Sequence, residues 1–170
     1  MRKYILLTAI AFNFSLHIHA QNPSVQNQPI FYLDSIRTDF NSLNKYIPDD
    51  IAFMSIYKDS SAVKIAGDEA KNGLVFAITK KYAREQYWNL FCSLSPEYIK
   101  AVPSIDWDKN VVYFLNDKVI ENNIEGTLYN IDRDNIIEIK VISKKQIKRA
   151  FNIQNKTAGI LITTKKTDNK

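Results

Sequence analysis

One pattern occurs twice in this 170-residue chain and constrains its fold more than any other feature. Each copy consists of an apolar strand, a helix and a second apolar strand. The segments are residues 51–57, 58–67 and 74–79 in the first copy and 135–143, 144–151 and 158–166 in the second. A pattern that recurs along a chain indicates that one structural unit is repeated. The sequence therefore predicts an α+β fold with two related units.

The rest of the chain is divided around these two copies. Each unit is predicted to be a strand-helix-strand-helix-strand arrangement with a small mixed sheet. The predicted segments are a signal peptide at 1–20, a flexible leader at 21–28, unit 1 at 29–81, a helical bridge at 82–109, unit 2 at 110–166 and a tail at 167–170. The pattern leaves open whether the units share one hydrophobic core or have two.

Short motifs around the glycines support the repeat. Gly73 and Gly159 each stand just before a closing apolar strand, where a residue without Cβ permits a tight reversal. Gly67 falls where the first helix should end, and Asp59 stands at its predicted capped start. Gly126 has no match in the other copy. These positions predict two similar helix–turn–strand connections.

The N-terminal residues are typical of a secretory signal peptide. A positive start at Arg2 and Lys3 is followed by a mostly apolar run over 4–16, and small Ala20 precedes Gln21. The run is too short to span a bilayer comfortably. We therefore expect an exported protein, in the periplasm first, with the cell surface or secretion as alternatives. No transmembrane segment is expected after signal removal.

Removal of the signal peptide limits the available chemistry. Both histidines, His17 and His19, leave with it, so the mature chain lacks the side chain that nucleophilic triads and zinc sites usually need. No cofactor or metal is predicted. Two of the 23 basic residues also leave, so 21 remain against 18 acidic ones, a net charge of +3 that selects no partner. Cys92 lies among apolar residues and is predicted to be a buried structural thiol; the alternative is a reactive thiol, which needs a nearby cation.

Several segments resemble the plug domain of TonB-dependent outer-membrane receptors, in particular the nutrient-importing receptors of Bacteroidota. The segments that carry the resemblance are 31–34, 48–51, 55–62, 65–67, 72–75, 113–116 and the closing strand 159–166. The resemblance implies plug-like units and an envelope protein, a receptor or a sensor, as partner. Only residues 167–170 follow the second unit, so we expect no barrel and no transport by this chain alone.

Two groups of charged residues are candidate sites. A basic cluster could meet an acidic protein or lipopolysaccharide phosphate, although a solvated face is the alternative favoured by its spacing. Its members are Lys140, Lys144, Lys145, Lys148 and Arg149. Asp106 and Asp108 flank Trp107 and could act as paired carboxylates, but a solvated loop is the favoured interpretation.

We expect, from these observations together, a non-catalytic exported envelope protein that acts as a protein-interaction module. The alternative is a soluble periplasmic binder of a small nutrient or glycan. An enzyme that uses the carboxylates is a third hypothesis, and it predicts that changing Asp106 or Asp108 abolishes turnover. Nucleic acid is not an expected partner, since the chain is predicted to be exported.

Overall fold

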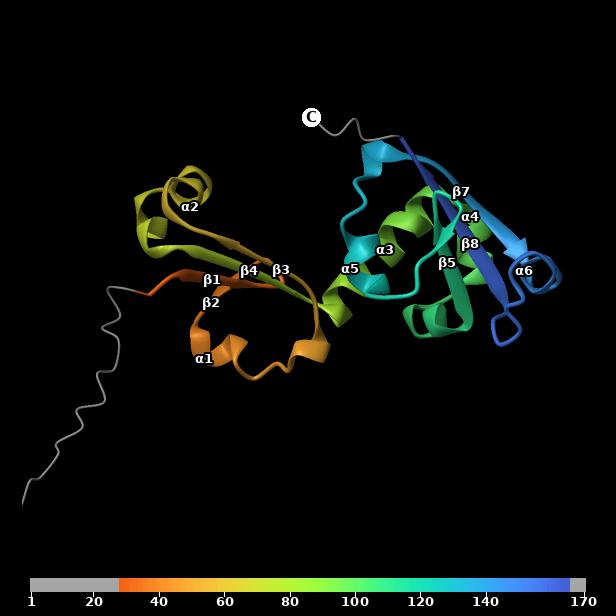
Figure 1. Ribbon diagram of the computed structural model, residues 1–170, viewed down its shortest axis with the longest axis horizontal. Coiled ribbons are helices and arrows are strands. Elements are labelled where there is room, and N and C mark those ends of the chain that lie inside the picture. Colours follow the sequence, from red (N-terminus) through yellow and green to blue (C-terminus); the bar gives the residue numbers. More distant parts are fainter. Residues whose placement is uncertain (1–27, 166–170) are drawn as a thin grey trace, which may run out of the picture.

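Two small mixed β-sheets with helices packed on them form the protein, whose computed structural model describes residues 28–165 (Figure 1). The fold is α+β, as the sequence predicts. Unit 1 comprises β1 (Ile30–Leu33), β2 (Ile36–Thr38), α1 (Phe40–Leu43), η2 (Pro48–Asp50), β3 (Ile51–Tyr57), α2 (Asp59–Ala66), η3 (Asp68–Asn72) and β4 (Leu74–Thr79). Unit 2 comprises β5 (Val111–Leu115), β6 (Lys118–Val119), α5 (Ile124–Tyr129), η5 (Arg133–Asn135), β7 (Ile136–Ser143), α6 (Lys144–Phe151) and β8 (Ala158–Thr164). Between them in sequence lie α3 (Lys80–Leu94), α4 (Pro96–Ala101) and η4 (Ile105–Asn110). The predicted signal peptide lies outside the described residues.

The two sheets have the same topology. Their strand orders are β2-β1-β4-β3 and β6-β5-β8-β7. In each sheet the two central strands are parallel to each other, and each edge strand is antiparallel to its neighbour. The register also shifts at the same place, after Ile51 in β3 and after Ile136 in β7. The predicted repeat of one fold is therefore confirmed.

Each unit begins with a β-hairpin, β1–β2 or β5–β6, and the two hairpins have the same kind of turn. Asp34 and Asn116 are the first turn residues, with φ of 51° and 48°, and a second left-handed residue follows each. Two-residue hairpin turns favour this geometry because it matches the twist of the strands. Asp34 then accepts a hydrogen bond from the backbone N–H of Thr79 at 2.7 Å, and Asn116 accepts one from Thr164 at 2.9 Å. Each turn is thus tied to the end of its central strand.

The helices α2 and α6 are equivalent eight-residue elements. They end at Gly67 and Asn152, whose φ values are 73° and 57°. The predicted helix end at Gly67 is confirmed. Their starts differ, because Ser143 caps α6 with its side chain, whereas Lys58 makes no such bond. The predicted cap of α2 is therefore wrong, and its first residue, Asp59, has a left-handed φ of 50°.

The two glycines predicted to precede the closing strands have different positions. Gly73, with φ of 110°, precedes β4 as predicted. Gly159 lies inside β8, opposite Ile142, and the residue in the equivalent place of unit 1 is Leu74, opposite Tyr57. The prediction that Gly159 permits a reversal is therefore wrong.

Gly159 is explained by packing. The pair Ile51–Thr79 in unit 1 matches the pair Ile136–Thr164 in unit 2, so equivalent residues of the two strand–helix–strand segments are 85 positions apart. By this offset, Ala62 of α2 corresponds to Ile147 of α6. Ala62 shares a buried cluster with Leu74. In unit 2 the large side chain is on the helix instead, and a Cβ on Gly159 would lie 2.7 Å from Cγ2 of Ile147. Each helix–strand contact combines one large and one small residue, with the sizes exchanged.

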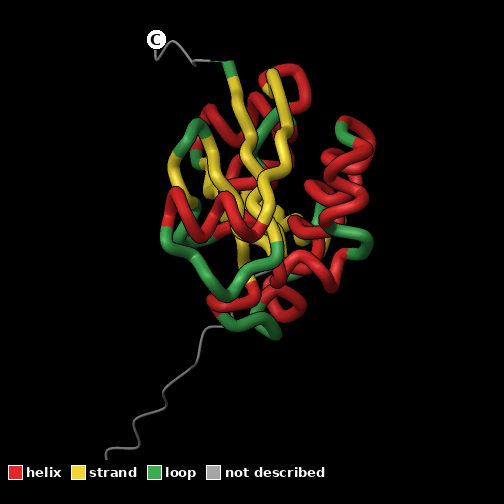
Figure 2. Tube along the Cα trace, turned by 90° about the vertical axis from the view of Figure 1, so that its right-hand side faces the viewer, coloured by secondary structure: helices red, strands yellow, loops and turns green. Residues whose placement is uncertain are grey.

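The helices of the predicted bridge form part of the core of unit 2. Together, α3, α4 and α5 cover one face of its sheet, and α6 covers the other through Ile147. Helices accordingly lie on more than one side of the strands in the view from this end of the molecule (Figure 2). The buried residues of the α3 side are Tyr87, Phe91, Tyr98, Val102, Val111, Tyr113, Ile120, Leu128, Ile131, Ile160 and Ile162.

Unit 1 has a separate, smaller core beneath α2, so the units have two cores. A small seam joins them, where Ala52 and Ile78 of unit 1 contact Ala83 of α3. Gly126 of α5 completes this seam, because a Cβ there would lie 2.3 Å from the carbonyl oxygen of Ala52. Gly126 thus permits a close approach between α5 and the backbone of unit 1.

Candidate functional site

One face of the sheet in unit 1 is exposed along its edge strand, β3. Successive strand residues point to opposite faces, and α2 packs on only one of them. The strand residues of the opposite face, which we call the free face, are Phe31 and Leu33 of β1, Val75 and Ala77 of β4, and Met54 and Ile56 of β3. On the edge strand, Met54 and Ile56 remain 47% and 61% exposed. These are large fractions for apolar side chains on a sheet.

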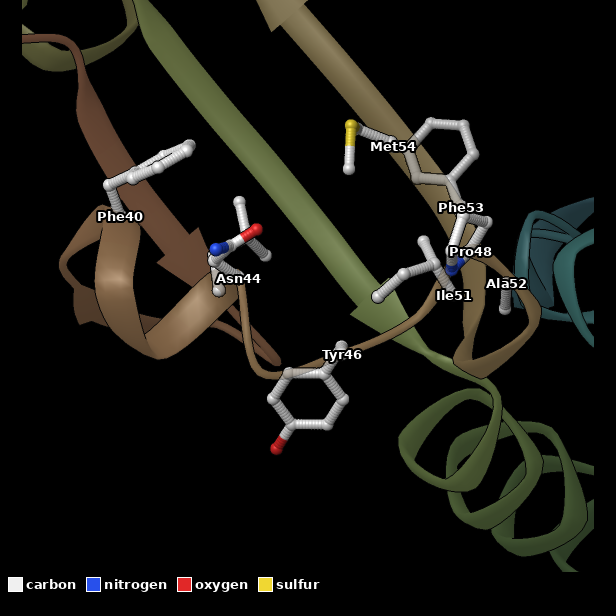
Figure 3. A pocket seen from close by; sticks show the side chains of 9 residues that line it. Phe40, Asn44, Tyr46, Pro48, Ile51, Ala52, Phe53 and Met54 are labelled. Carbon is white, nitrogen blue, oxygen red and sulfur yellow. The ribbon is translucent and has the colours of Figure 1, made fainter.

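The short helix α1 covers part of the free face. The ring of Phe40 lies 5.9 Å from that of Phe31, yet Phe40 remains 52% exposed. A hollow of about 510 Å³ remains between α1 and β3, and Phe40 and Met54 point into it from opposite sides (Figure 3). Tyr46 lies at its edge, and no charged side chain lines it. The site is therefore suited to apolar contact.

The equivalent face of unit 2 is more completely covered. The register places Tyr113, Ile160 and Val141 where unit 1 has Phe31, Val75 and Ile56. Helix α3 packs on these residues, and its Tyr87 and Phe91 are 1% and 0% exposed. The central strands of this face are thus buried in both units, since Phe31 and Val75 are each only 8% exposed. The difference lies at the edge strand, where Ile139 and Val141 of unit 2 are half-buried and their equivalents Met54 and Ile56 are exposed.

A buried carboxylate lies beneath α3. The hydroxyls of Tyr87 and Tyr113 both donate to Asp108, the former at 2.6 Å, and the hydroxyls of Tyr98 and Tyr113 lie 2.8 Å apart. The Nε atom of Arg84 lies 3.8 Å from the same carboxylate. The Asp108 side chain is only 11% exposed. Elements from four parts of the chain therefore converge on one acidic group.

This network changes the interpretation of the Asp106–Asp108 pair. Asp106 is exposed as predicted, but the prediction of a solvated loop is wrong for Asp108. Burial raises the pKa of Asp108, although the hydrogen bonds from Tyr113 and Tyr87 lower it. Burial likewise raises the pKa of the Tyr87, Tyr98 and Tyr113 hydroxyls. Both carboxylate oxygens accept hydrogen bonds, which favours a structural role.

A polar hollow of about 490 Å³ lies beside this network. Its charged lining residues are Arg84, Asp106, Asp108, Lys109, Glu125 and Lys156. Arg84 donates to Glu125 at 2.5 Å, and the Lys156 ammonium donates to the carbonyl of Lys109 at 2.7 Å. This hollow could bind a small polar molecule. Over residues 28–165 the structure contains no group of three side chains suited to hold a metal ion.

The predicted basic cluster lies on the edge of unit 2. Lys140 belongs to β7 and the other members to α6, and all five are exposed. None of the three ion pairs found among the described residues involves them. The structure thus brings these charges onto neighbouring elements, away from both hollows.

Cys92 is partly buried against the core of unit 2. Burial raises the pKa of its thiol, which favours the unreactive, protonated form. This agrees with the interpretation as a structural thiol.

Comparison with protein-family models, curated proteins and solved structures finds no match for this chain. The resemblance to receptor plugs therefore stays a prediction. Within residues 28–165, no helix has the length and apolar character needed to cross a membrane.

Sequence reasoning missed the free face and the tyrosine network. A signal for the first was available, because β3 reads Ile-Ala-Phe-Met-Ser-Ile-Tyr without a charged residue, whereas β7 contains Glu138 and Lys140. An edge strand usually includes such charges. Nothing in the sequence indicated the network, because Tyr87, Tyr98 and Tyr113 come from three different elements.

Proposed function

We propose that this chain is a non-catalytic, exported envelope protein that acts as a protein-interaction module and binds its partner through the free face of unit 1. The observation that carries the proposal is the unequal exposure of two equivalent edge strands: Met54 and Ile56 are exposed in unit 1, whereas Ile139 and Val141 are half-buried in unit 2. An apolar patch left in water by a folded domain is typical of a protein contact site. The exposed Met54, Ile56 and Phe40 make this face such a patch.

The nature of the partner follows from the sequence. The predicted signal peptide places the mature chain outside the cytoplasm, and the plug-like motifs favour a receptor or a sensor of the envelope. The uncharged lining of the hollow beside Met54 favours an apolar contact over a small charged ligand.

Crosslinking in cells tests this proposal. A photo-reactive amino acid placed at residue 54 should capture one dominant envelope protein, identified by mass spectrometry. Ile137 of β7 is the matched control, because it is an apolar side chain with 62% exposure on the edge strand of unit 2. The same adducts from both positions, or none from residue 54, would contradict the proposal.

The polar hollow beside Asp108 favours a second function, binding of a small nutrient or glycan. A ligand that binds only the folded state raises the melting temperature. A thermal-shift screen with sugars, peptides and iron chelates should then show stabilisation, which Asp106→Ala and Lys109→Ala together should reduce. A flat response across the screen would remove this alternative.

A further inference from the structure

The charge of the mature chain is divided unevenly along its length. Residues 139–166 contain eight basic residues and no acidic one, which gives a net charge of +8. Residues 21–138 contain 12 basic and 17 acidic residues, a net charge of −5. Such an asymmetry favours interaction with a polyanion or a membrane. We propose that the basic cluster of α6 and β7 binds the phosphate groups of an anionic lipid bilayer.

The repeat shows that the fold itself does not require this charge. By the offset of 85 positions, residues 139–166 correspond to residues 54–81, which contain five basic and three acidic residues, a net charge of +2. The helices differ in the same direction, because α6 contains four basic residues and no acidic one, whereas α2 contains one of each, Lys64 and Asp59. The same fold is thus built with and without a strongly positive surface, so the charge has another cause.

The fold gathers five of the eight cations at one end of the molecule. Lys145 and Arg149 each lie two residues from buried Ile147, so they project from the side of α6 that faces away from the sheet. Lys140 precedes Ile142 by two residues on β7 and therefore shares its face, on which α6 packs. Helix α6 lies at the end of unit 2 that is remote from unit 1 (Figure 1). The cluster is therefore open to an extended surface.

The cluster also carries repulsion that its own chain does not offset. Lys145 and Arg149, like Lys144 and Lys148, are like charges four residues apart, a spacing that destabilises a helix. The ion pairs found within residues 28–165 include none of these cations. Anions from outside the chain would remove this repulsion.

The composition of the cluster favours lipid phosphates over a protein partner. Four of its five members are lysines, and lysine is depleted at protein–protein interfaces, where arginine is enriched. A lysine ammonium is a compact charge that needs no fixed geometry to bind a phosphate. Phe151, one turn from Lys148 at the end of α6, is 39% exposed. It supplies an apolar side chain beside the charges, as helices that lie at a membrane surface have.

Vesicle sedimentation tests the inference. Phosphatidylcholine vesicles that contain about one third phosphatidylglycerol should sediment the mature protein at low salt, and vesicles of phosphatidylcholine alone should not. Addition of about 0.5 M sodium chloride should release the protein, because salt screens exposed charges. Absence of sedimentation with the anionic vesicles, or equal sedimentation with both kinds, overturns the inference.

Protein variants locate the contact. Lys145→Gln with Arg149→Gln should weaken vesicle binding about 25-fold, or about fivefold for each cation removed. Lys58→Gln with Lys64→Gln is the matched control, because it removes two exposed cations next to and within α2 and leaves the same net charge. The control should bind within about twofold of wild type. Equal losses in both variants would show that net charge alone governs binding, which overturns the inference. All four side chains are exposed, so both variants should fold, and an unchanged melting temperature verifies this.

Other occupants of the cluster give different results. Tighter binding of wild type to polyglutamate or to a DNA duplex than to the anionic vesicles would identify a different polyanion and overturn the inference. Salt-sensitive self-association without vesicle binding, abolished by Lys145→Gln with Arg149→Gln, would show that the acidic part of a second copy is the occupant, which also overturns it. Capture by residue 54 in cells uses a different surface, so the proposed function stands or fails separately.

Discussion

Units 1 and 2 share a fold but use one face of it differently. In both, a hairpin, a short helix and a strand–helix–strand segment form a four-stranded sheet with identical order. The face opposite the eight-residue helix is buried under α3 and α4 in unit 2, and it is left to the four-residue α1 in unit 1. Met54 and Ile56 are consequently exposed, whereas their equivalents in unit 2, Ile139 and Val141, are half-buried.

This difference shows that topology and covering are separate properties. Hydrogen bonds between strands and the left-handed turn residues specify the topology, and both units contain them. The covering of a sheet face depends on which other segments of the same chain pack on it. The segment between the two units packs on unit 2. One copy is therefore covered by helices from the segment between the units, and the other retains exposed apolar side chains on its edge strand.

The largest difference between the units should appear at high pH. Burial raises the pKa of Tyr87, Tyr98 and Tyr113 above the ordinary value of 10.0 that the unfolded chain has. The stability that these protonated hydroxyls contribute is complete below pH 10 and is lost as the pH rises further. We expect unit 2 to unfold between about pH 10 and pH 12, with tyrosinate absorbance rising in the same step. Fluorescence of Trp88 and Trp107 reports on the unfolding of unit 2. Ionisation of the tyrosines without unfolding would contradict the prediction.

Exchanging the large and the small residue of the helix–strand contact in unit 2 should have the next largest effect on stability. Gly159→Leu introduces the residue of unit 1 into unit 2 and should destabilise the protein by about 4 kcal/mol, because Ile147 occupies the space. Adding Ile147→Ala should restore part of this loss, since it reproduces the Ala62–Leu74 pair but leaves Ile142 and Phe114 close to the new side chain. Urea unfolding of the two single variants and the double variant measures the coupling. Additive effects would show that the two contacts are not equivalent.

Removal of the buried carboxylate should affect unit 2 somewhat less. Asp108→Ala removes the acceptor of the Tyr87 hydroxyl and one of two hydrogen-bond partners of the Tyr113 hydroxyl, and it should cost about 3 kcal/mol in urea unfolding. Asp106→Ala, the exposed neighbour, should change stability by less than about 0.5 kcal/mol. Equal effects at the two positions would remove the distinction between them.

The pH dependence of this site has a defined sign. Because the pKa of Asp108 is raised in the folded protein, its stabilising contribution is fully present below about pH 4 and decreases as the pH rises through the raised value. Comparison of the unfolding free energy of wild type and Asp108→Ala across this range should show that the variant lacks this slope.

Equivalent positions on the two faces should respond unequally to charge. Val141→Lys places an ammonium under the covering helices and should destabilise the protein by about 2 kcal/mol. Ile56→Lys, its equivalent in unit 1, should change stability by less than about 0.5 kcal/mol, because the side chain is already exposed. Thermal or urea unfolding checks both, and similar losses would show that the free face is covered within the chain.

The basic cluster should have the smallest effect on stability. Lys144→Glu with Lys148→Glu should alter the unfolding free energy by less than about 0.5 kcal/mol, since both side chains are exposed and outside the described ion pairs. Urea unfolding of wild type and the double variant measures the difference. A loss well above this limit would show that these side chains contribute to the fold of unit 2.

Several features were predictable because they depend on neighbours in sequence. The repeat, the α+β class and the helix end at Gly67 follow from apolar periodicity and from residues that tolerate positive φ. Gly159 was misinterpreted for a related reason: adjacency to a strand suggested a turn, whereas contact with Ile147 from another element explains it. The pairing of large and small residues across a helix–strand contact is not visible along the chain.

The amino-acid sequence by itself determined two units of one kind, since strand periodicity and turn residues act over a few neighbours. Only the tertiary structure decided that α3 covers unit 2, that Asp108 lies beneath it, and that Met54 and Ile56 remain exposed. An amphipathic helix between two apolar faces can in principle bury its stripe on either. Polar partners such as Glu125 and Tyr113, which only one face supplies, favour the choice that the fold makes.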